Sequence, residues 1–193
     1  SGIVGLDRST LQPFGRLNGV GNRAPQLDIE RNRLITFNNN LNTVDIIDLK
    51  RWALTRRIQL NGSILFMETS ALDWKNNKYF LLEDNKILEI DLSTGQSYPI
   101  FETGTAYPKF SWLPRQMLFY PGRNLLMAKA GLNVLLIDTR QGSIVADYKL
   151  SNSDMPFLRS DGSLFTVGFR AETKQAGGGF YLQARHFRTS RSE

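Results

Sequence analysis

Short apolar stretches alternate with polar turns along the whole chain, and no stretch keeps a 3.6-residue apolar period for three turns. The apolar stretches are rich in β-branched and aromatic residues, and Asn, Asp, Gly and Ser separate them. This pattern predicts an all-β protein with little helix. The clearest example is "RLITFNNNLNTVDIIDLKRWALTRRIQL", in which strands are expected at 33–39, 44–52 and 54–60.

The apolar pattern repeats along the chain. The segments "VDIIDLKRW", "ILEIDLSTG" and "VLLIDTRQG" bring Asp48, Asp91 and Asp138 into register at spacings of 43 and 47 residues. Asp7 stands 41 residues before Asp48, and Arg185 takes the equivalent place 47 residues after Asp138, within the apolar run "GFYLQARHF". A fixed period of this length indicates a repeat fold.

Each repeat predicts up to four strands, and we expect five units in a single domain over 1–193. The units are 1–19, 20–62, 63–102, 103–152 and 153–193. First strands are expected at 24–30, 70–75, 116–121 and 155–160, and second strands at 33–39, 78–84, 124–130 and 163–169. Fourth strands are expected at 11–17, 54–60, 96–101 and 143–150. Four antiparallel strands at a period near 43 are typical of a β-propeller blade.

The segment 33–60 resembles the YVTN type of propeller repeat. The matching positions are Leu34 to Phe37, Asn42-Thr43-Val44, Ile47-Asp48 and Ile58 to Leu60. The other units keep the apolar pattern and the Ile-Asp pair, so nearly the whole chain resembles propellers of the YVTN, WD40-like and quinoprotein-like kind. That resemblance implies a β-propeller of about four to five repeats, and a binding scaffold before an enzyme.

Two arrangements of the blades are compatible with the sequence. The first and last units together supply a ring of four blades with one strand to spare, which would make a small closed propeller; we favour this arrangement. Alternatively, the chain is part of a larger propeller and associates with further blades or with a second chain. An open arc would leave strand edges unpaired.

Charge and composition narrow the partners only modestly. The net charge is +6, and 16 of the 24 cations are Arg, which favours acidic protein surfaces, nucleic acid or anionic lipid. Because these cations are scattered, an ordinary basic surface is the simpler interpretation. The absence of Cys excludes disulfides and thiolate metal sites. No apolar run is long enough for a transmembrane helix.

The repeated aspartates are predicted to act as turn residues rather than as acid–base or metal groups. Each Asp ends a third strand, and Gly95 and Gly142 follow four residues later in two units, as a tight hairpin requires. Asp45 and Asp48 should point to opposite faces of their strand, so they should not form a dyad.

The remaining motifs give no catalytic residue, metal site or cofactor. "GVGNRAP" (19–25) fits a dinucleotide fingerprint by letters alone, but Pro25 argues against the helix that such a site requires. We therefore expect a loop between blades there, and a flexible hairpin at Gly177-Gly178-Gly179. His186 is the only histidine, and the sequence contains no nucleophile motif such as Gly-x-Ser-x-Gly with which it could form a catalytic triad. Asn61-Gly62-Ser63 is a glycosylation sequon.

The segment "TGTAYPKFSWLPRQMLFYPGR" (103–123) is the strongest candidate for binding. Its aromatic and basic residues either fill space between blades or form a protruding loop, and such residues are enriched at interface hot spots. The candidate partner-binding residues are Tyr107, Lys109, Phe110, Trp112, Arg115, Arg51 and Trp52. We expect a non-enzymatic scaffold that binds a protein through its rim loops. The alternatives are nucleic-acid binding through an Arg-rich face, and a propeller enzyme with a metal in its channel.

Overall fold

The structure, a computed structural model, describes residues 2–61, 69–82, 86–102, 116–130, 133–149, 155–158, 164–170 and 179–185. These residues form seventeen β-strands and, within the described ranges, no helix. No segment of the described chain is therefore a helix able to cross a membrane. The all-β class expected from the apolar pattern is confirmed.

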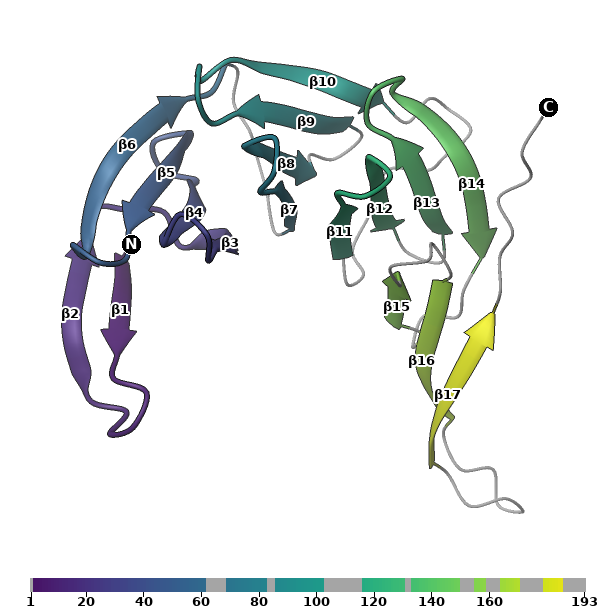
Figure 1. Ribbon diagram of the computed structural model, residues 1–193, viewed down its shortest axis with the longest axis horizontal. Helices are drawn as coiled ribbons and strands as arrows, with labels where there is room; N and C mark the ends of the chain where they lie inside the picture. The colour runs from purple at the N-terminus through teal and green to yellow at the C-terminus, as the bar shows by residue number, and fades with distance from the viewer. Residues whose placement is uncertain are drawn as a thin grey trace. The chain divides into compact units, whose positions relative to one another are not determined.

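The strands form five antiparallel sheets in which consecutive strands are neighbours (Figure 1). The first sheet has two strands, β1 (Gly2–Leu6) and β2 (Pro13–Asn18). The second contains β3 (Arg23–Asp28), β4 (Arg33–Asn38), β5 (Thr43–Asp48) and β6 (Ala53–Gln59). The third contains β7 (Ser70–Asp73), β8 (Lys78–Leu82), β9 (Lys86–Asp91) and β10 (Ser97–Glu102).

The fourth sheet contains β11 (Gln116–Tyr120), β12 (Leu125–Ala130), β13 (Asn133–Asp138) and β14 (Ser143–Lys149). The fifth has three strands, β15 (Met155–Leu158), β16 (Leu164–Arg170) and β17 (Gly179–Arg185). Each sheet draws all its strands from one of the five repeat units. Three sheets are four-stranded meanders, as expected for propeller blades.

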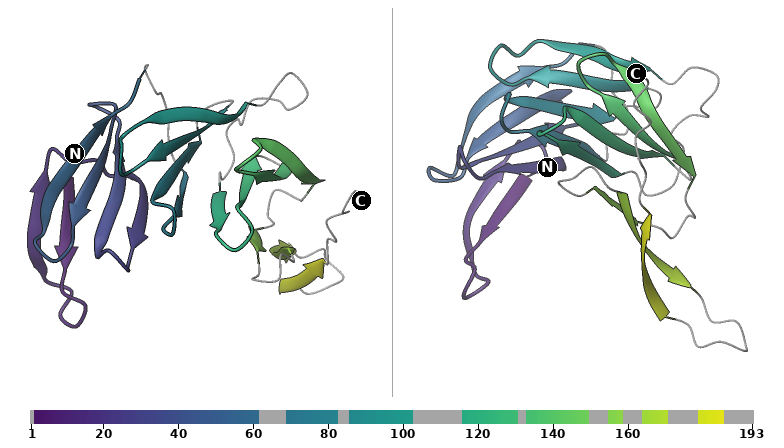
Figure 2. Two further views of the ribbon diagram at one scale, coloured as in Figure 1. Left: turned by 45° about the horizontal axis from the view of Figure 1, so that its top comes forward. Right: turned by 45° about the vertical axis from the view of Figure 1, so that its right-hand side comes forward.

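The chain divides into two compact units, Ser1–Ala106 (unit 1) and Tyr107–Glu193 (unit 2). Unit 1 holds β1 to β10, and unit 2 holds β11 to β17. The turned views show the strands of each sheet running side by side (Figure 2).

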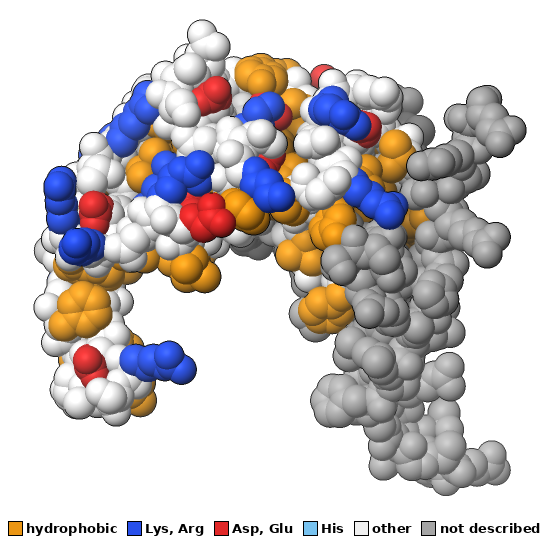
Figure 3. Space-filling model, viewed as in Figure 1, with side chains coloured by type: hydrophobic (Ala, Val, Ile, Leu, Met, Phe, Trp, Pro, Cys, Tyr) orange, Lys and Arg blue, Asp and Glu red, His pale blue; other side chains and the backbone are white. Residues whose placement is uncertain are grey.

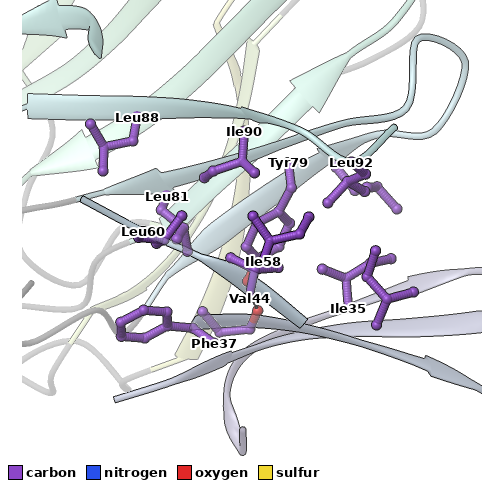
Figure 4. Packing of buried hydrophobic residues seen from close by; sticks show 13 residues of the cluster. Ile35, Phe37, Val44, Ile58, Leu60, Tyr79, Leu81, Leu88, Ile90 and Leu92 are labelled. Atoms are coloured by element: carbon purple, nitrogen blue, oxygen red, sulfur yellow. Dashed lines mark hydrogen bonds between the residues drawn. The ribbon is translucent and has the colours of Figure 1, made fainter. Parts of the chain in front are cut away.

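The core of unit 1 lies between its two four-stranded sheets (Figure 4). Phe37, Val44 and Ile58 project from β4, β5 and β6, and they meet Tyr79 and Ile90 of β8 and β9. Alternation along each strand puts these apolar side chains on one face. Each large side chain buried in this way contributes about 1.5–3 kcal/mol to stability.

In unit 2, the described core is centred on the β11–β14 sheet. Met127, Val134 and Leu136 are buried together, and Ala146 and Tyr148 of β14 pack against them. This cluster uses the second, third and fourth strands of its sheet, whereas the core of unit 1 also includes Ala24 and Leu72 from the first strands β3 and β7.

Candidate interaction rim

In four of the five described sheets, a repeated aspartate closes the turn that follows the third strand. Asp91 Oδ1 accepts the N–H groups of Ser93 and Thr94 at 2.7 and 2.9 Å, and Asp138 Oδ1 accepts that of Arg140 at 2.8 Å. Asp48 Oδ1 accepts the N–H of Arg51 at 2.8 Å. The predicted turn role is confirmed, because every side chain in the set is occupied by its own turn.

Asp7 makes the same turn with the most hydrogen bonds. Its Oδ1 accepts the hydroxyl and the backbone N–H of both Ser9 and Thr10. The hydroxyl of Ser9, followed by the bonds from Thr10, holds the pKa of Asp7 down to about 2. At Asp91, the N–H of Thr94 is the main cause of a lowered pKa.

The fourth residue after each aspartate adopts a left-handed backbone conformation. Gly95 and Gly142 have φ of 84° and 64°, and their N–H groups donate to the carbonyls of Asp91 and Asp138. In the other two sheets this position holds Leu11 and Trp52, with φ of 56° and 50°. The turn therefore has the same left-handed backbone conformation in all four sheets, although Leu11 and Trp52 lack the conformational freedom of glycine.

A second repeated turn joins the first and second strands, and the sequence reasoning missed it. Asn32, Asn77 and Asn124 all have positive φ, at spacings of 45 and 47 residues. The carbonyl of each accepts, at 2.9 Å, the N–H of the residue after the third-strand aspartate, which is Leu49, Leu92 or Thr139. In each of these three sheets, the hydrogen bond thus joins the two turns to one another. The recurring Asn was the only signal in the sequence.

Hydrogen bonds from arginine side chains join the turns of neighbouring sheets in unit 1. Arg31 Nη1 donates to the carbonyl of Trp74 at 2.6 Å, and Arg33 donates to Asn77 Oδ1. Arg56 Nη1 donates to the carbonyls of Leu92 and Ser93. These bonds join the β3–β6 sheet to the β7–β10 sheet along one edge.

Asp28 anchors two of these arginines. Its side chain is buried, and it accepts Arg33 Nε at 2.9 Å and Arg31 Nη1 at 3.2 Å. Burial acts to raise the pKa of Asp28, but the hydrogen bonds from Arg33 and Arg31 outweigh it and lower the pKa. The arginines are therefore held by an ionised carboxylate.

We call the four turns 29–32, 49–52, 74–77 and 92–96 the hairpin rim of unit 1. Ile29 is 79% exposed, and Lys50, Arg51 and Lys75 are also exposed on this rim. Lys75 Nζ lies 5.3 Å from the centre of the Trp74 ring, within cation–π range. In the view of Figure 3, Lys and Arg side chains are spread over the described sheets, with Asp and Glu side chains among them. The rim can offer charge and one apolar contact to an acidic partner.

Trp52 lies on this rim but is half-buried. Its ring packs edge-on against the ring of Phe14, with 5.1 Å between the two ring centres. The indole also lies close to Gly15, where an added Cβ would come within 2.5 Å of it. The indole Nε1 is buried without a hydrogen-bond partner. Its visible contacts are therefore with β2, and it joins the β1–β2 sheet to the β3–β6 sheet.

Asp45 anchors the loop before β3. It is fully buried and accepts Gly21 N at 2.8 Å, Arg57 Nε at 2.7 Å and Asn38 Nδ2 at 3.3 Å. Burial opposes its ionisation, but these bonds, led by that from Arg57, lower its pKa. The "GVGNRAP" segment leads into a strand and not into a helix: residues 19–22 connect β2 to β3, and β3 begins within the segment at Arg23. Asp45 and Asp48 have separate partners and form no dyad.

Several candidate residues lie outside the described part of the chain. These are Tyr107, Lys109, Phe110, Trp112, Arg115, His186 and the Gly62-Ser63 part of the sequon. Of the partner-binding candidates, Arg51 and Trp52 are described, and both lie on the turn 49–52. The described residues contain no group of three or more His, Cys, Asp or Glu side chains placed to hold a metal ion.

No protein-family model matches the chain, and no curated protein matches it. Solved structures do match. Hydrazine synthase of Kuenenia stuttgartiensis aligns with a TM-score of 0.66 and 14% identity, covering 95% of this chain and 60% of that chain. A nidogen/laminin complex aligns with a TM-score of 0.60 and 16% identity, covering 86% of this chain and 65% of that one.

The chain therefore spans less than two thirds of either solved chain. Both solved proteins contain propellers, and the match, together with the four-stranded sheets, shows a β-propeller fold. One match is named as an enzyme and the other as a protein complex, so fold alone does not distinguish the two kinds of function.

Proposed function

We propose that the chain is a non-enzymatic propeller scaffold that binds an acidic protein surface through the hairpin rim of unit 1. The observation that supports this most directly is the bonding of the rim. Its turns are tied within each sheet through Asn32 and Asn77 and between sheets through Arg31, Arg33 and Arg56. A surface fixed in this way loses little conformational entropy when a partner binds.

The chemistry of the rim suggests the partner. Lys50, Arg51 and Lys75 supply positive charge, and Ile29 supplies apolar area beside them. Exposed cations mainly set the association rate and the choice of partner, whereas a buried apolar contact slows dissociation. A partner with an acidic surface and a small apolar recess would bind both the cations and Ile29. The segment 103–115 adds Trp112 and Arg115 as further candidate contacts in this proposal.

The test compares two charge-reversal variants of the chain. The double substitution Lys50→Glu with Arg51→Glu reverses the charge of two residues on the rim. The control, Arg16→Glu with Lys149→Glu, changes the net charge by the same amount at exposed positions outside the rim. Partners captured by the wild-type chain should bind the rim variant about tenfold more weakly and the control variant equally well. Ile29→Ser should speed dissociation.

Two results would contradict the proposal. Equal loss of partners from both variants would show that net charge, not the rim, governs binding. Capture that disappears after nuclease treatment and falls steeply with salt would favour the nucleic-acid alternative instead.

A further inference from the structure

Arg56 of β6 is a half-buried cation that two backbone carbonyls hold in place. Its Nη1 donates to the carbonyl of Leu92 at 2.8 Å and to that of Ser93 at 2.6 Å. A guanidinium carries five N–H donors, so three remain, one on Nε and two on Nη2. Among the described residues, none of these three has an acceptor. Because the Nε–H and one Nη2–H are parallel, they form a free two-donor edge of the guanidinium.

Arg56 also has no carboxylate partner in the described part of the chain. Two other half-buried cations of unit 1 do have one. Arg33 pairs with Asp28 at 2.9 Å. Lys78 pairs with Glu89 at 2.6 Å. A cation that is partly removed from water is costly unless an anion compensates it, and two carbonyls compensate Arg56 only in part. The site therefore favours an added negative charge.

The next residue, Arg57, shows what this edge of a guanidinium binds. Its Nε donates to Asp45 Oδ1 at 2.7 Å and its Nη2 donates to Asp45 Oδ2 at 3.2 Å, so a single carboxylate takes both donors. Consecutive residues of a strand point to opposite faces of the sheet. Arg57 thus uses, on a carboxylate of its own chain, the same edge that Arg56 leaves free on the other face.

Gly95 keeps the space in front of Arg56 Nη2 open. An added Cβ at Gly95 would lie 3.1 Å from Nη2, which is within the range of a hydrogen-bond acceptor. Ser93 of the same turn is exposed, so this space lies at the surface of the hairpin rim. A carboxylate that enters from solvent would meet the two free donors there.

The acidic residues of unit 1 outside the described ranges are attached far from this space. Each of them is within two residues of Thr69 or Leu82 in the sequence. Leu82 N donates to the carbonyl of Thr69, and Leu82 lies opposite Ile87 of β9. The strand needs five residues, or about 16 Å, to run from Ile87 to Leu92. These acids therefore join the β7–β10 sheet at its other end.

The beginning of the sequence does not affect the environment of Arg56 either. Arg56 lies on the face of the β3–β6 sheet that meets the β7–β10 sheet, where it bonds to Leu92 and Ser93. On the opposite face, Arg57 Nη2 donates to the carbonyl of Gly19, which directly follows β2. The β1–β2 sheet is thus on the side of Arg57, and a carboxylate for Arg56 is expected from another molecule.

We propose that the free edge of Arg56 binds a single carboxylate of an Asp or Glu side chain on the acidic partner. This inference rests on the proposed function and names the group that the rim recognises. One guanidinium balances one negative charge, so a carboxylate fits the site better than a phosphate monoester, which carries nearly two. Because both donors are fixed in direction, the site also orients the partner on the rim.

Acetate is the probe, and the full chain labelled with 15N is the receptor. When acetate replaces chloride at pH 7 and constant ionic strength, the Nε–H signal of Arg56 and the N–H signal of Gly95 should shift saturably. Half of the shift should be reached at about 0.1 M acetate. The Nε–H of Arg57, which already binds Asp45, is the internal control and should not shift. Inorganic phosphate that binds about tenfold more tightly than acetate would overturn the assignment to a carboxylate.

Two variants test the geometry of the site. Asn tolerates the left-handed conformation, and in Gly95→Asn its side chain would occupy the space before Arg56 Nη2, so acetate should bind about tenfold more weakly. Gly142→Asn makes the same change in the equivalent turn of unit 2 and should leave the titration unchanged. Arg56→Lys keeps the charge but removes the parallel donors, and it should weaken acetate binding about tenfold. Equal acetate binding by Gly95→Asn and Gly142→Asn would overturn the proposal.

Partner binding distinguishes this proposal from the proposed function. Gly95→Asn should weaken partner binding about tenfold, and Gly142→Asn should not change it. If acetate leaves the Arg56 signal unshifted while Lys50→Glu with Arg51→Glu weakens partner binding, the carboxylate site is wrong and the proposed function stands. If acetate binds at Arg56 while that charge reversal leaves partner binding unchanged, Arg56 is a carboxylate site and the proposed function is wrong.

Discussion

At the scale of single residues, Trp52 shows how packing can outweigh backbone preference. It occupies the left-handed position that glycine takes at Gly95 and Gly142. A bulky residue there costs about 1–2 kcal/mol relative to glycine. The sequence predicted that Trp52 contacts a partner on the rim, which stays a prediction, and the structure adds a packing contact of its half-buried ring with Phe14. That contact joins residues far apart in sequence, so no local pattern could reveal it.

We predict that Trp52→Gly destabilises unit 1 despite relieving the backbone. The stability lost with the half-buried ring and its contact with Phe14 should exceed the stability gained from a relaxed backbone. The free energy of unfolding should fall by about 1–2 kcal/mol. Urea unfolding measures the loss, and hydrogen exchange should show faster exchange in β1 and β2. Gly95→Ala, which adds strain without losing packing, provides the comparison. A Trp52→Gly chain more stable than wild type would show that the indole is not a structural clamp.

At the scale of elements, the apolar pattern predicted the strands well because alternation and turn residues are local. Every third strand ends at or next to its register residue, from Asp48 to Arg185. The turn at Asn32, Asn77 and Asn124 was missed because the flanking residues differ in each unit and the shared property is a backbone angle. The Arg31 and Arg33 bonds were missed for another reason: they cross between sheets and leave no periodic trace.

Substitutions at these asparagines separate their two contributions. Asn32→Gly keeps the positive φ, so it should change stability by less than about 0.5 kcal/mol. Asn77→Gly should cost about 1 kcal/mol more, because the Asn77 side chain also accepts from Arg33 and donates to Ser93 Oγ at 2.6 Å. Denaturant unfolding of both variants, with Arg33→Ala as partner in a double-mutant cycle, measures the difference. An equal loss of unfolding free energy at the two positions would show that the side-chain hydrogen bonds of Asn77 do not stabilise the rim.

At the scale of the whole molecule, the fold could be predicted from the sequence, whereas the rim that we propose for binding could be predicted only in part. The register of Asp7, Asp48, Asp91 and Asp138 led to blades because each blade is a local meander. A binding surface depends instead on which turns meet in space. Arg51 was identified by its charge, whereas Ile29 and Lys75 became visible only when the sheets were placed side by side. The candidates in 103–115 remain predictions.

Unit 1 should lose stability in acid, with Asp45 as a main contributor. The pKa values of Asp28, Asp45 and Asp91 are lowered in the folded chain, while unfolded Asp titrates near about 3.9. A group with a lower pKa in the folded state binds fewer protons there, so its stabilisation is complete above the unfolded value. It is then lost as the pH falls from about 4 through the folded value.

Asp45→Asn tests this directly, because the amide keeps the shape of the protonated acid. The variant should be less stable by about 2 kcal/mol at pH 7, since Arg57 loses its ionised partner and Gly21 N a charged acceptor. The difference from wild type should shrink below about pH 4, where wild-type Asp45 itself takes up a proton. Glu30→Gln, which removes one negative charge at an exposed position, is the control. Urea unfolding at pH 7, 5 and 3 measures all three chains, and a difference between Asp45→Asn and wild type that stays constant with pH would show that the charge of Asp45 does not stabilise unit 1.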